Sequence, residues 1–163
     1  MPITSSISWT EDLARIDWDE LAALYRAAPL GDKSAGDLRL VFTNSMFRVF
    51  AFEQGALIGA GRALADGRDC SYLCDIAVMP SHQGIGLGKQ IVDRLVRLSA
   101  GHRKIILYSV PGREPFYEAF GFRRMTTAMA IFEDPAKALR SGYLERAWRK
   151  RAPKTLLKAE GLA

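Results

Sequence analysis

The sequence has few of the residues that build disulfides and metal sites, with two cysteines and two histidines among 163 residues. Cys70 and Cys74 stand four residues apart, which separates them by about 13 Å along an extended strand. A disulfide needs alpha carbons closer than about 7 Å. We therefore expect two free thiols, which is typical of a reducing compartment, and no metal site.

The sequence also lacks any hydrophobic run long enough to span a membrane, and its first residues lack the basic start and apolar stretch of a signal peptide. It has no low-complexity stretch and no excess of glycine or proline, which argues against extensive disorder. With 48% hydrophobic residues, the chain has room for one domain with a substantial core. We expect a cytoplasmic protein with no membrane partner.

Most of the chain has no excess of positive charge. Residues 1–136 hold 15 basic against 16 acidic residues, whereas residues 137–163 hold eight basic residues against two acidic ones. We therefore predict one domain over residues 1–136 and a basic C-terminal extension over residues 137–163. The extension is most simply a solvated basic helix, with docking to nucleic acid, an acidic partner or another subunit as alternatives. The balanced charge of the domain argues against nucleic acid.

Hydrophobic periodicity predicts a mixed α/β domain. Three successive strands precede a strand–helix–strand order, which favours a mixed sheet that is antiparallel in part. In the extension, Leu139, Tyr143 and Trp148 form an apolar stripe on an expected helix over residues 136–150, which would cover the domain or a second subunit in a homodimer. The other expected helices span residues 17–25, 34–42, 88–98 and 114–120, and the expected strands span 7–10, 47–52, 57–63, 71–78, 104–110 and 125–132.

Three glycines, Gly84, Gly86 and Gly88, stand between an expected strand and the most strongly amphipathic helix. Such a turn leaves backbone N–H groups free, and the helix dipole adds about half a positive charge, so a phosphate or pyrophosphate is the natural ligand. A dinucleotide fingerprint is excluded because Lys89 stands where the third glycine is required. An NTPase phosphate loop is excluded because Gln90 follows Lys89. A turn that only reverses the chain is the alternative.

This segment resembles the signature of the GCN5-related N-acetyltransferases (GNAT), which is Gln or Arg, two residues, Gly, one residue, and Gly or Ala. Gln83, Gly86 and Gly88 match it. About 30 residues later, Phe116-Tyr117 and Gly121-Phe122 resemble the Phe-Tyr and Gly-Phe pairs that follow the fifth strand of the family. The resemblance covers about residues 7–132. It implies a three-layer α/β fold whose mixed, mostly antiparallel sheet is splayed at the fourth strand.

The resemblance implies an enzyme that transfers an acetyl group from acetyl-coenzyme A to a primary amine, by direct attack in a ternary complex. Backbone amides of the glycine segment would hold the pyrophosphate, and the exposed edge of the fourth strand would pair with the pantetheine arm. A backbone N–H near Val78 would stabilise the oxyanion. The residues expected to contact the coenzyme are Ile76, Ala77, Val78, Gln83, Gly84, Ile85, Gly86, Leu87, Gly88, Lys89, Phe116 and Tyr117.

Tyr117 aligns with the tyrosine that many members use to protonate the departing thiolate; a core aromatic is the alternative. Asp75, the only carboxylate on the expected fourth strand, is the candidate general base. Strict alternation would place Asp75 with Leu73 and Ala77, opposite Cys74, and a bulge at this point would change that assignment. A buried structural acid is the other reading of Asp75, and Glu53 or a water relay could supply the base instead.

The acceptor is open at this point, and a small amine, with an aromatic amine among the options, is our first choice. Tyr72 and Trp18 are candidates to line its pocket, although aromatics at such spacings are more often core residues. Cys74 could carry an acyl group, but its apolar neighbours favour an inert thiol. The alternative functions are a non-catalytic acyl-coenzyme A sensor, a protein N-acetyltransferase, and a structural protein that has lost its coenzyme.

Overall fold

The computed structural model describes residues 6–145. It forms two compact units, of which the first ends at Tyr108 and the second begins at Ser109. This division falls inside the predicted domain of residues 1–136, so the boundary expected after residue 136 stays a prediction.

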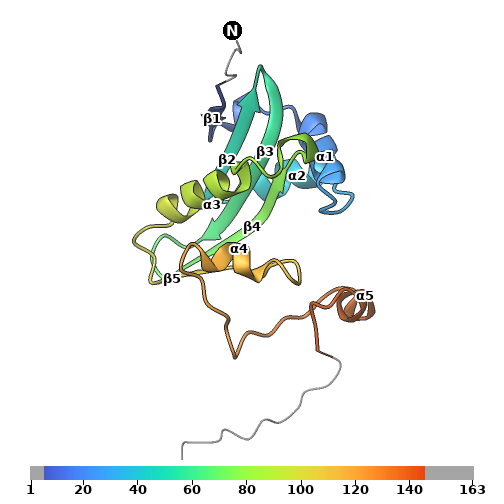
Figure 1. Cartoon of the computed structure of the whole chain (residues 1–163), viewed down its shortest axis with the longest axis vertical. Helices are drawn as coiled ribbons and strands as arrows, with labels where there is room; N and C mark the ends of the chain where they lie inside the picture. Colours follow the sequence, from blue (N-terminus) through green and yellow to red (C-terminus); the bar gives the residue numbers. More distant parts are fainter. Residues whose placement is uncertain (1–5, 146–163) are drawn as a thin grey trace, which may run out of the picture. The chain divides into compact units, whose positions relative to one another are not determined.

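The first unit is built on a five-stranded sheet in the order β1-β2-β3-β4-β5 (Figure 1). The first four strands pair antiparallel, and β5 runs parallel to β4. Gln54 and Gly55 join β2 and β3 with positive φ at both positions, as a tight hairpin turn requires. The mixed, mostly antiparallel sheet is thus confirmed. Its strands are β1 (Ser8–Thr10), β2 (Phe47–Glu53), β3 (Ala56–Ala65), β4 (Cys70–Val78) and β5 (Lys104–Ile106).

Helices cover both faces of this sheet (Figure 1). The helices α1 (Trp18–Ala27) and α2 (Ala35–Thr43) lie on one face, and α3 (Leu87–Leu98) lies on the other. Asp17 begins α1 by accepting bonds from two backbone N–H groups of the first turn, and Ser34 caps α2 through the N–H of Asp37. These caps confirm the two helix starts expected from the sequence. Two single-turn helices, η1 (Leu13–Arg15) and η2 (Pro80–His82), complete the unit.

Each face of the sheet has its own core. Towards α1 and α2, the buried rings of Tyr25, Phe42 and Phe50 form a chain of aromatic contacts. Towards α3, a Cβ added at Gly61 would lie 2.8 Å from Ile91 Cγ2. Such a separation is shorter than side chains tolerate, so α3 can lie this close only because β3 carries a glycine there.

The second unit contains α4 (Glu114–Glu118) and α5 (Pro135–Arg140). The strand expected over residues 125–132 is absent from the described structure, where residues 123–131 are exposed, and the strand expected over 104–110 ends at Ile106. Those two predictions were wrong because apolar content shows that a segment can pair, whereas a strand also needs a neighbour to pair with. The helix expected over 136–150 ends at Arg140, and Trp148 lies outside the described residues.

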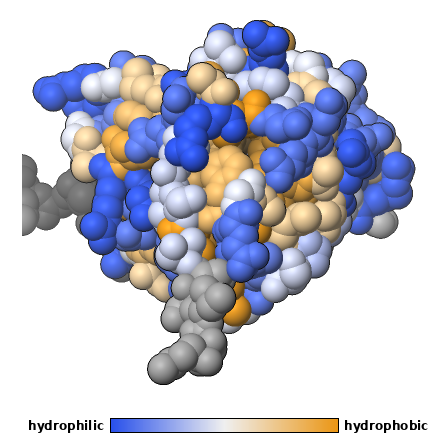
Figure 2. Space-filling view, turned by 90° about the horizontal axis from the view of Figure 1, so that it is seen from above, coloured by the Kyte–Doolittle hydropathy of each residue, from blue (hydrophilic) through white to orange (hydrophobic). Residues whose placement is uncertain are grey.

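The face drawn in Figure 2 is mostly hydrophilic, with apolar side chains visible in small areas between polar ones. Scattered apolar groups of this kind are ordinary on protein surfaces. Among residues 6–145, no helix has the length and apolar character needed to cross a membrane.

Candidate functional site

The segment of residues 83–89, which we call the glycine loop, connects η2 to α3 and exposes its backbone. Gly84 and Gly86 have φ of 81° and 89°, and Gly86 is the N-cap of α3 without a side-chain capping bond. Within the described residues, no protein group accepts a hydrogen bond from the backbone N–H groups of residues 84–89. No heavy atom stands within 4 Å of a Cβ built on either glycine. The loop therefore presents a set of free, unobstructed donors at a helix N-terminus, which suits a phosphate or pyrophosphate.

Two side-chain contacts hold the glycine loop against the sheet. Gln83 Nε2 donates to the carbonyl oxygen of Val78 over 3.1 Å, at the end of β4. His82 Nε2 lies 2.8 Å from Glu53 Oε2 on β2, and its Nδ1 lies 2.8 Å from Ser81 Oγ. Sequence reasoning overlooked His82, although its place directly before the loop was the available signal. Glu53, a candidate base from the sequence, is instead engaged with this histidine.

The strand β4 pairs with β5 only at its beginning and continues beyond it. Only Cys70, Ser71 and Tyr72 pair with β5, and β4 then continues through residues 73–78 without a β5 partner in the described structure. The splay predicted at the fourth strand is thereby confirmed. Because the splayed edge ends at Val78, directly before η2 and the glycine loop, an extended ligand bound at the loop could pair with the free edge.

A β-bulge interrupts β4 at Asp75. Cys74 pairs with Arg62 and Ala77 pairs with Ala60, so Asp75 and Ile76 together oppose the single residue Gly61. Asp75 has φ of 53°, one of two non-glycine residues with positive φ in the part of the chain that the structure describes. Strict alternation along β4, which had separated Asp75 from Cys74, is therefore wrong, because a bulge inserts one residue and shifts the side-chain pattern.

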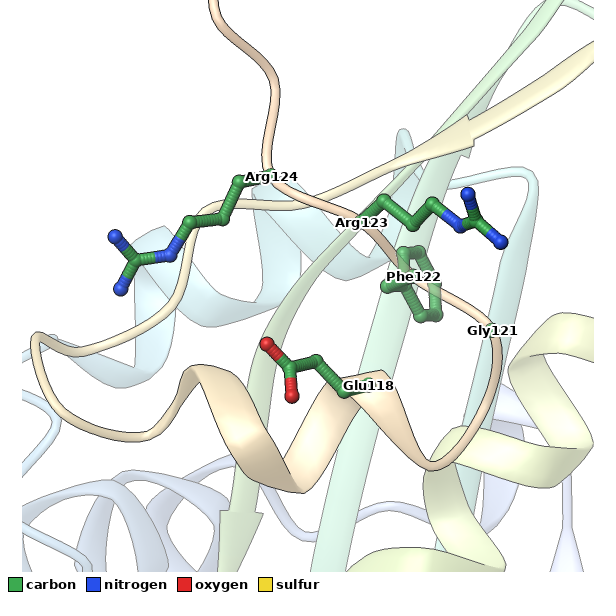
Figure 3. Close-up of a pocket in the computed structure, with 5 residues that line it drawn as sticks. All are labelled: Glu118, Gly121, Phe122, Arg123 and Arg124. Carbon is green, nitrogen blue, oxygen red and sulfur yellow. The ribbon is translucent and has the colours of Figure 1, made fainter.

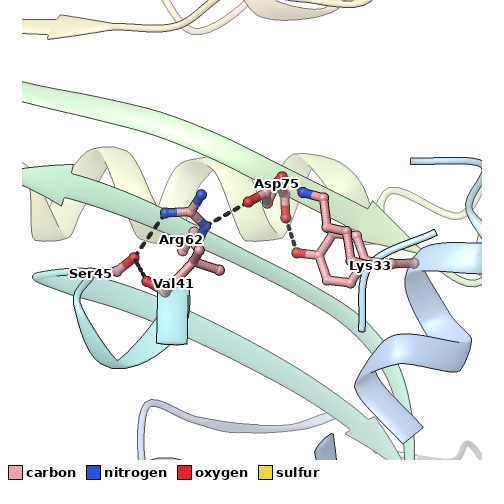
Figure 4. Close-up of polar contacts among 6 residues, drawn as sticks. Lys33, Val41, Ser45, Arg62 and Asp75 are labelled. Atoms are coloured by element: carbon pink, nitrogen blue, oxygen red, sulfur yellow. Dashed lines mark hydrogen bonds and ion pairs between the residues drawn. The ribbon is translucent and has the colours of Figure 1, made fainter. Parts of the chain in front are cut away.

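The Asp75 carboxylate lies in a cluster of polar side chains on the face of the sheet that α1 and α2 cover (Figure 4). Its Oδ1 forms an ion pair with Lys33 Nζ, and its Oδ2 accepts from Arg62 Nε over 2.6 Å. Arg62 also donates to Ser45 Oγ, which in turn donates to the carbonyl oxygen of Val41. The Tyr25 hydroxyl donates to the backbone carbonyl of Asp75.

Both oxygens of Asp75 are thus engaged by cations. Burial by itself would raise the pKa of this carboxyl, but the hydrogen bond from Lys33 and the charge of Arg62 outweigh it and hold the pKa below its ordinary value. A carboxylate that binds protons less readily than usual is a poor general base. The arrangement supports the alternative of a structural acid.

Cys74 directly precedes Asp75 in the chain, and burial raises the pKa of its thiol to about 11, which favours the inert-thiol alternative over an acyl carrier.

Tyr72, a candidate to line the acceptor pocket, stacks on Tyr108 with ring centroids 6.1 Å apart. Trp18 packs against the core below α1, so the structure gives it a core role. Within the described residues, no three His, Cys, Asp or Glu side chains form a group suited to a metal ion.

In the second unit, Tyr117 lies on α4 between aromatic neighbours. Its ring meets Phe116 edge-on at 4.9 Å and Phe122 at 6.2 Å. Burial raises the pKa of Tyr117, so its hydroxyl stays protonated across the usual assay range. The coenzyme contacts expected of Phe116 and Tyr117 stay predictions.

The same unit contains an open pocket of about 500 Å³ (Figure 3). The Glu118 side chain lies between Arg124 on one side and Phe122 on the other, and Arg124 also forms an exposed ion pair with Glu114 over 3.2 Å. These charged groups are solvated surface side chains, and the pocket lacks the enclosed apolar walls typical of ligand sites. Its lining residues are Glu118, Gly121, Phe122, Arg123 and Arg124.

Comparisons with known proteins identify the family of this chain. A family model described as an acetyltransferase (GNAT) domain matches residues 34–131. GCN5-related N-acetyltransferase 3, chloroplastic, from Arabidopsis thaliana is 40% identical over 88 residues, which cover 52% of this chain and 37% of that protein. The chain spans less than two thirds of the length of the curated relatives it matches.

Solved structures show the same fold. A probable acetyltransferase from meticillin-resistant Staphylococcus aureus superposes with a TM-score of 0.71 at 22% identity, covering 79% of this chain and 99% of that one. An aminoglycoside N-acetyltransferase in complex with coenzyme A superposes with a TM-score of 0.64 at 19% identity, covering 82% of this chain and 98% of that one. The family model extends over more than half of the sequence, and the chain therefore belongs to the GNAT acetyltransferase family.

Proposed function

We propose that this protein transfers an acetyl group from acetyl-coenzyme A to a primary amine of a small molecule. The observation that carries the proposal is the row of free backbone N–H groups over residues 84–89, placed at the N-terminus of α3 where the splayed edge of β4 ends. The loop fits a pyrophosphate and the edge fits a pantetheine arm. The aminoglycoside N-acetyltransferase that shares the fold is named for a small-molecule amine, which supports an acceptor of that class.

In the proposed reaction, the free amine attacks the thioester carbonyl, with both substrates bound at once. The backbone N–H near Val78 stabilises the oxyanion, the carbon–sulfur bond breaks, and Tyr117 gives its proton to the leaving thiolate. The amine loses its proton to water, because Asp75 is held by two cations and Glu53 by His82. Side-chain and backbone contacts to the coenzyme come from residues 76–78, from the glycine loop, and from Phe116 and Tyr117.

The test combines binding with turnover. Acetyl-coenzyme A binding is measured by calorimetry, and free thiol release is measured over a panel of primary amines. We expect Tyr117→Phe to lose about 100-fold or more in kcat, in keeping with the size of general acid effects, while coenzyme affinity stays unchanged. Tyr143→Phe, a change of the same chemistry on a residue outside the proposed site, serves as the matched control and should keep full turnover.

A non-catalytic acyl-coenzyme A sensor is the competing function, because the free N–H groups of the loop require only that an anion binds. Tight coenzyme binding without thiol release from any amine in the panel would favour the sensor and defeat the enzyme proposal. A protein N-terminus as acceptor would show as turnover with peptides and none with small amines. The cytoplasmic location and the homodimer stay predictions.

A further inference from the structure

The cluster around Asp75 already contains a bound primary ammonium group. Lys33 places Nζ against Asp75 Oδ1 and 5.1 Å from the centroid of the Tyr25 ring. A carboxylate together with the face of an aromatic ring is a combination that recognises alkylammonium ions. A lysine side chain is itself a primary amine on a four-carbon stem, so this place already accommodates one alkylammonium group of the chain itself.

The two cations on Asp75 are not equivalent. The Arg62 side chain is 12% exposed and is also fixed by Ser45, and its removal would leave buried partners unpaired. The Lys33 side chain is 31% exposed, and the described contacts give its ammonium no second hydrogen-bond acceptor. Lys33 also lies on the connection between α1 and α2, where Gly31 adopts φ of 100°. Lys33 can therefore leave Asp75 at a smaller cost than Arg62.

We infer that Asp75 Oδ1 and the Tyr25 ring form a binding site for an ammonium group of the acceptor, which Lys33 fills when the acceptor is absent. The inference rests on the proposed function and narrows its substrate class. Exchange of one primary ammonium for another leaves the charge of the cluster unchanged, so Arg62 and Ser45 keep their partners.

The bound ammonium is not the nitrogen that reacts. An ion pair with Asp75 favours the protonated amine, whereas attack on a thioester needs the free base. The acceptor therefore carries two amines, one held at Asp75 and one free to reach the thioester. Val78 follows Asp75 by three residues, so about 10 Å of strand at most separates the two positions. A diamine whose nitrogen atoms are joined by several carbons meets this requirement.

The test compares cadaverine, a five-carbon diamine, with pentylamine, which has the same chain and one amine. Lys33→Met removes the internal competitor and keeps the length of the side chain. We expect it to lower the KM for cadaverine about fivefold, the value of one partly exposed ion pair, and to leave the KM for pentylamine unchanged. Lys33→Arg refills the site with another cation and should behave as the wild type does.

A binding measurement separates this inference from the enzyme proposal. Calorimetry should show cadaverine binding to Lys33→Met without acetyl-coenzyme A, and weaker binding to Lys33→Arg and to the double variant Lys33→Met, Asp75→Asn. If the double variant does not fold, Lys33→Arg alone supplies the comparison. Binding of this kind, together with no thiol release from any amine of the panel, would support the site and defeat the proposed enzyme. Equal KM changes for both amines, or equal cadaverine binding by Lys33→Met and Lys33→Arg, would overturn the inference.

Discussion

Gly86→Ala tests whether the glycine loop holds the coenzyme through backbone geometry. Gly86 has φ of 89°, and no heavy atom lies within 4 Å of the position that a Cβ would take there, so an added methyl group meets no neighbour. The substitution therefore acts through the backbone alone. Gly101 provides the matched control, because it has φ of 93°, equally open surroundings, and a position after the far end of α3.

The expected size of the effect follows from two costs. A left-handed conformation costs an alanine about 1–2 kcal/mol, so both variants should unfold at a temperature lower by roughly 2–8 °C. In Gly86→Ala the loop can relieve this strain by rotating, which turns its N–H groups away from the ligand. Each hydrogen bond to a charged group contributes about 1.5–3 kcal/mol, so losing one weakens coenzyme binding about 10- to 150-fold.

The assay is calorimetric titration of coenzyme A into the wild type and both variants, with thermal unfolding measured on the same samples. We expect Gly101→Ala to lose stability and keep its coenzyme affinity, whereas Gly86→Ala loses both. If Gly86→Ala binds coenzyme A within about threefold of the wild type, the phosphate contacts do not depend on this backbone, and our assignment of the site is refuted.

Three further predictions concern the sheet and its bulge. Gly61→Ala should lower the free energy of unfolding, measured by urea titration, by about 1–3 kcal/mol, because its Cβ would lie 2.8 Å from an Ile91 methyl group. The control Gly36→Ala on α2 should leave that free energy unchanged or raise it. Equal effects of the two substitutions would contradict the close packing of α3. Iodoacetamide should alkylate Cys74 about 100-fold more slowly than a free cysteine at pH 8, because the Cys74 pKa of about 11 leaves little thiolate. The rate is measured by mass spectrometry, and labelling as fast as that of free cysteine would contradict this prediction. Since the folded-state pKa of Asp75 is lowered, its ion pairs contribute stability above about pH 4 and lose it as pH falls through that lowered pKa. Asp75→Asn should therefore cost about 1–3 kcal/mol at pH 7 and less in acid, and a pH-independent difference would argue against the ion pairs.

Local sequence signals predicted those parts of the fold that depend on neighbouring residues. Asp17 and Ser34 were identified as helix starts because a capping side chain bonds to backbone within three residues of itself. The anion-binding turn before α3 was also identified from a short segment, residues 84–88. The strand prediction for residues 125–132 was wrong, because an apolar pattern shows that a segment can pair and contains no information about whether a partner strand is present.

The sequence by itself determined the order of the elements from β1 to α4, the glycine loop and the family to which the chain belongs, because these depend on short segments whose spacing is visible in one dimension. Only the tertiary structure decided the role of Asp75. The bulge that turns its side chain arises from pairing between β3 and β4, and its two cations come from positions 42 and 13 residues away. A carboxylate that looked like a base along the chain is an ion-paired anchor in space, since its proton affinity depends on charges that folding brings to it.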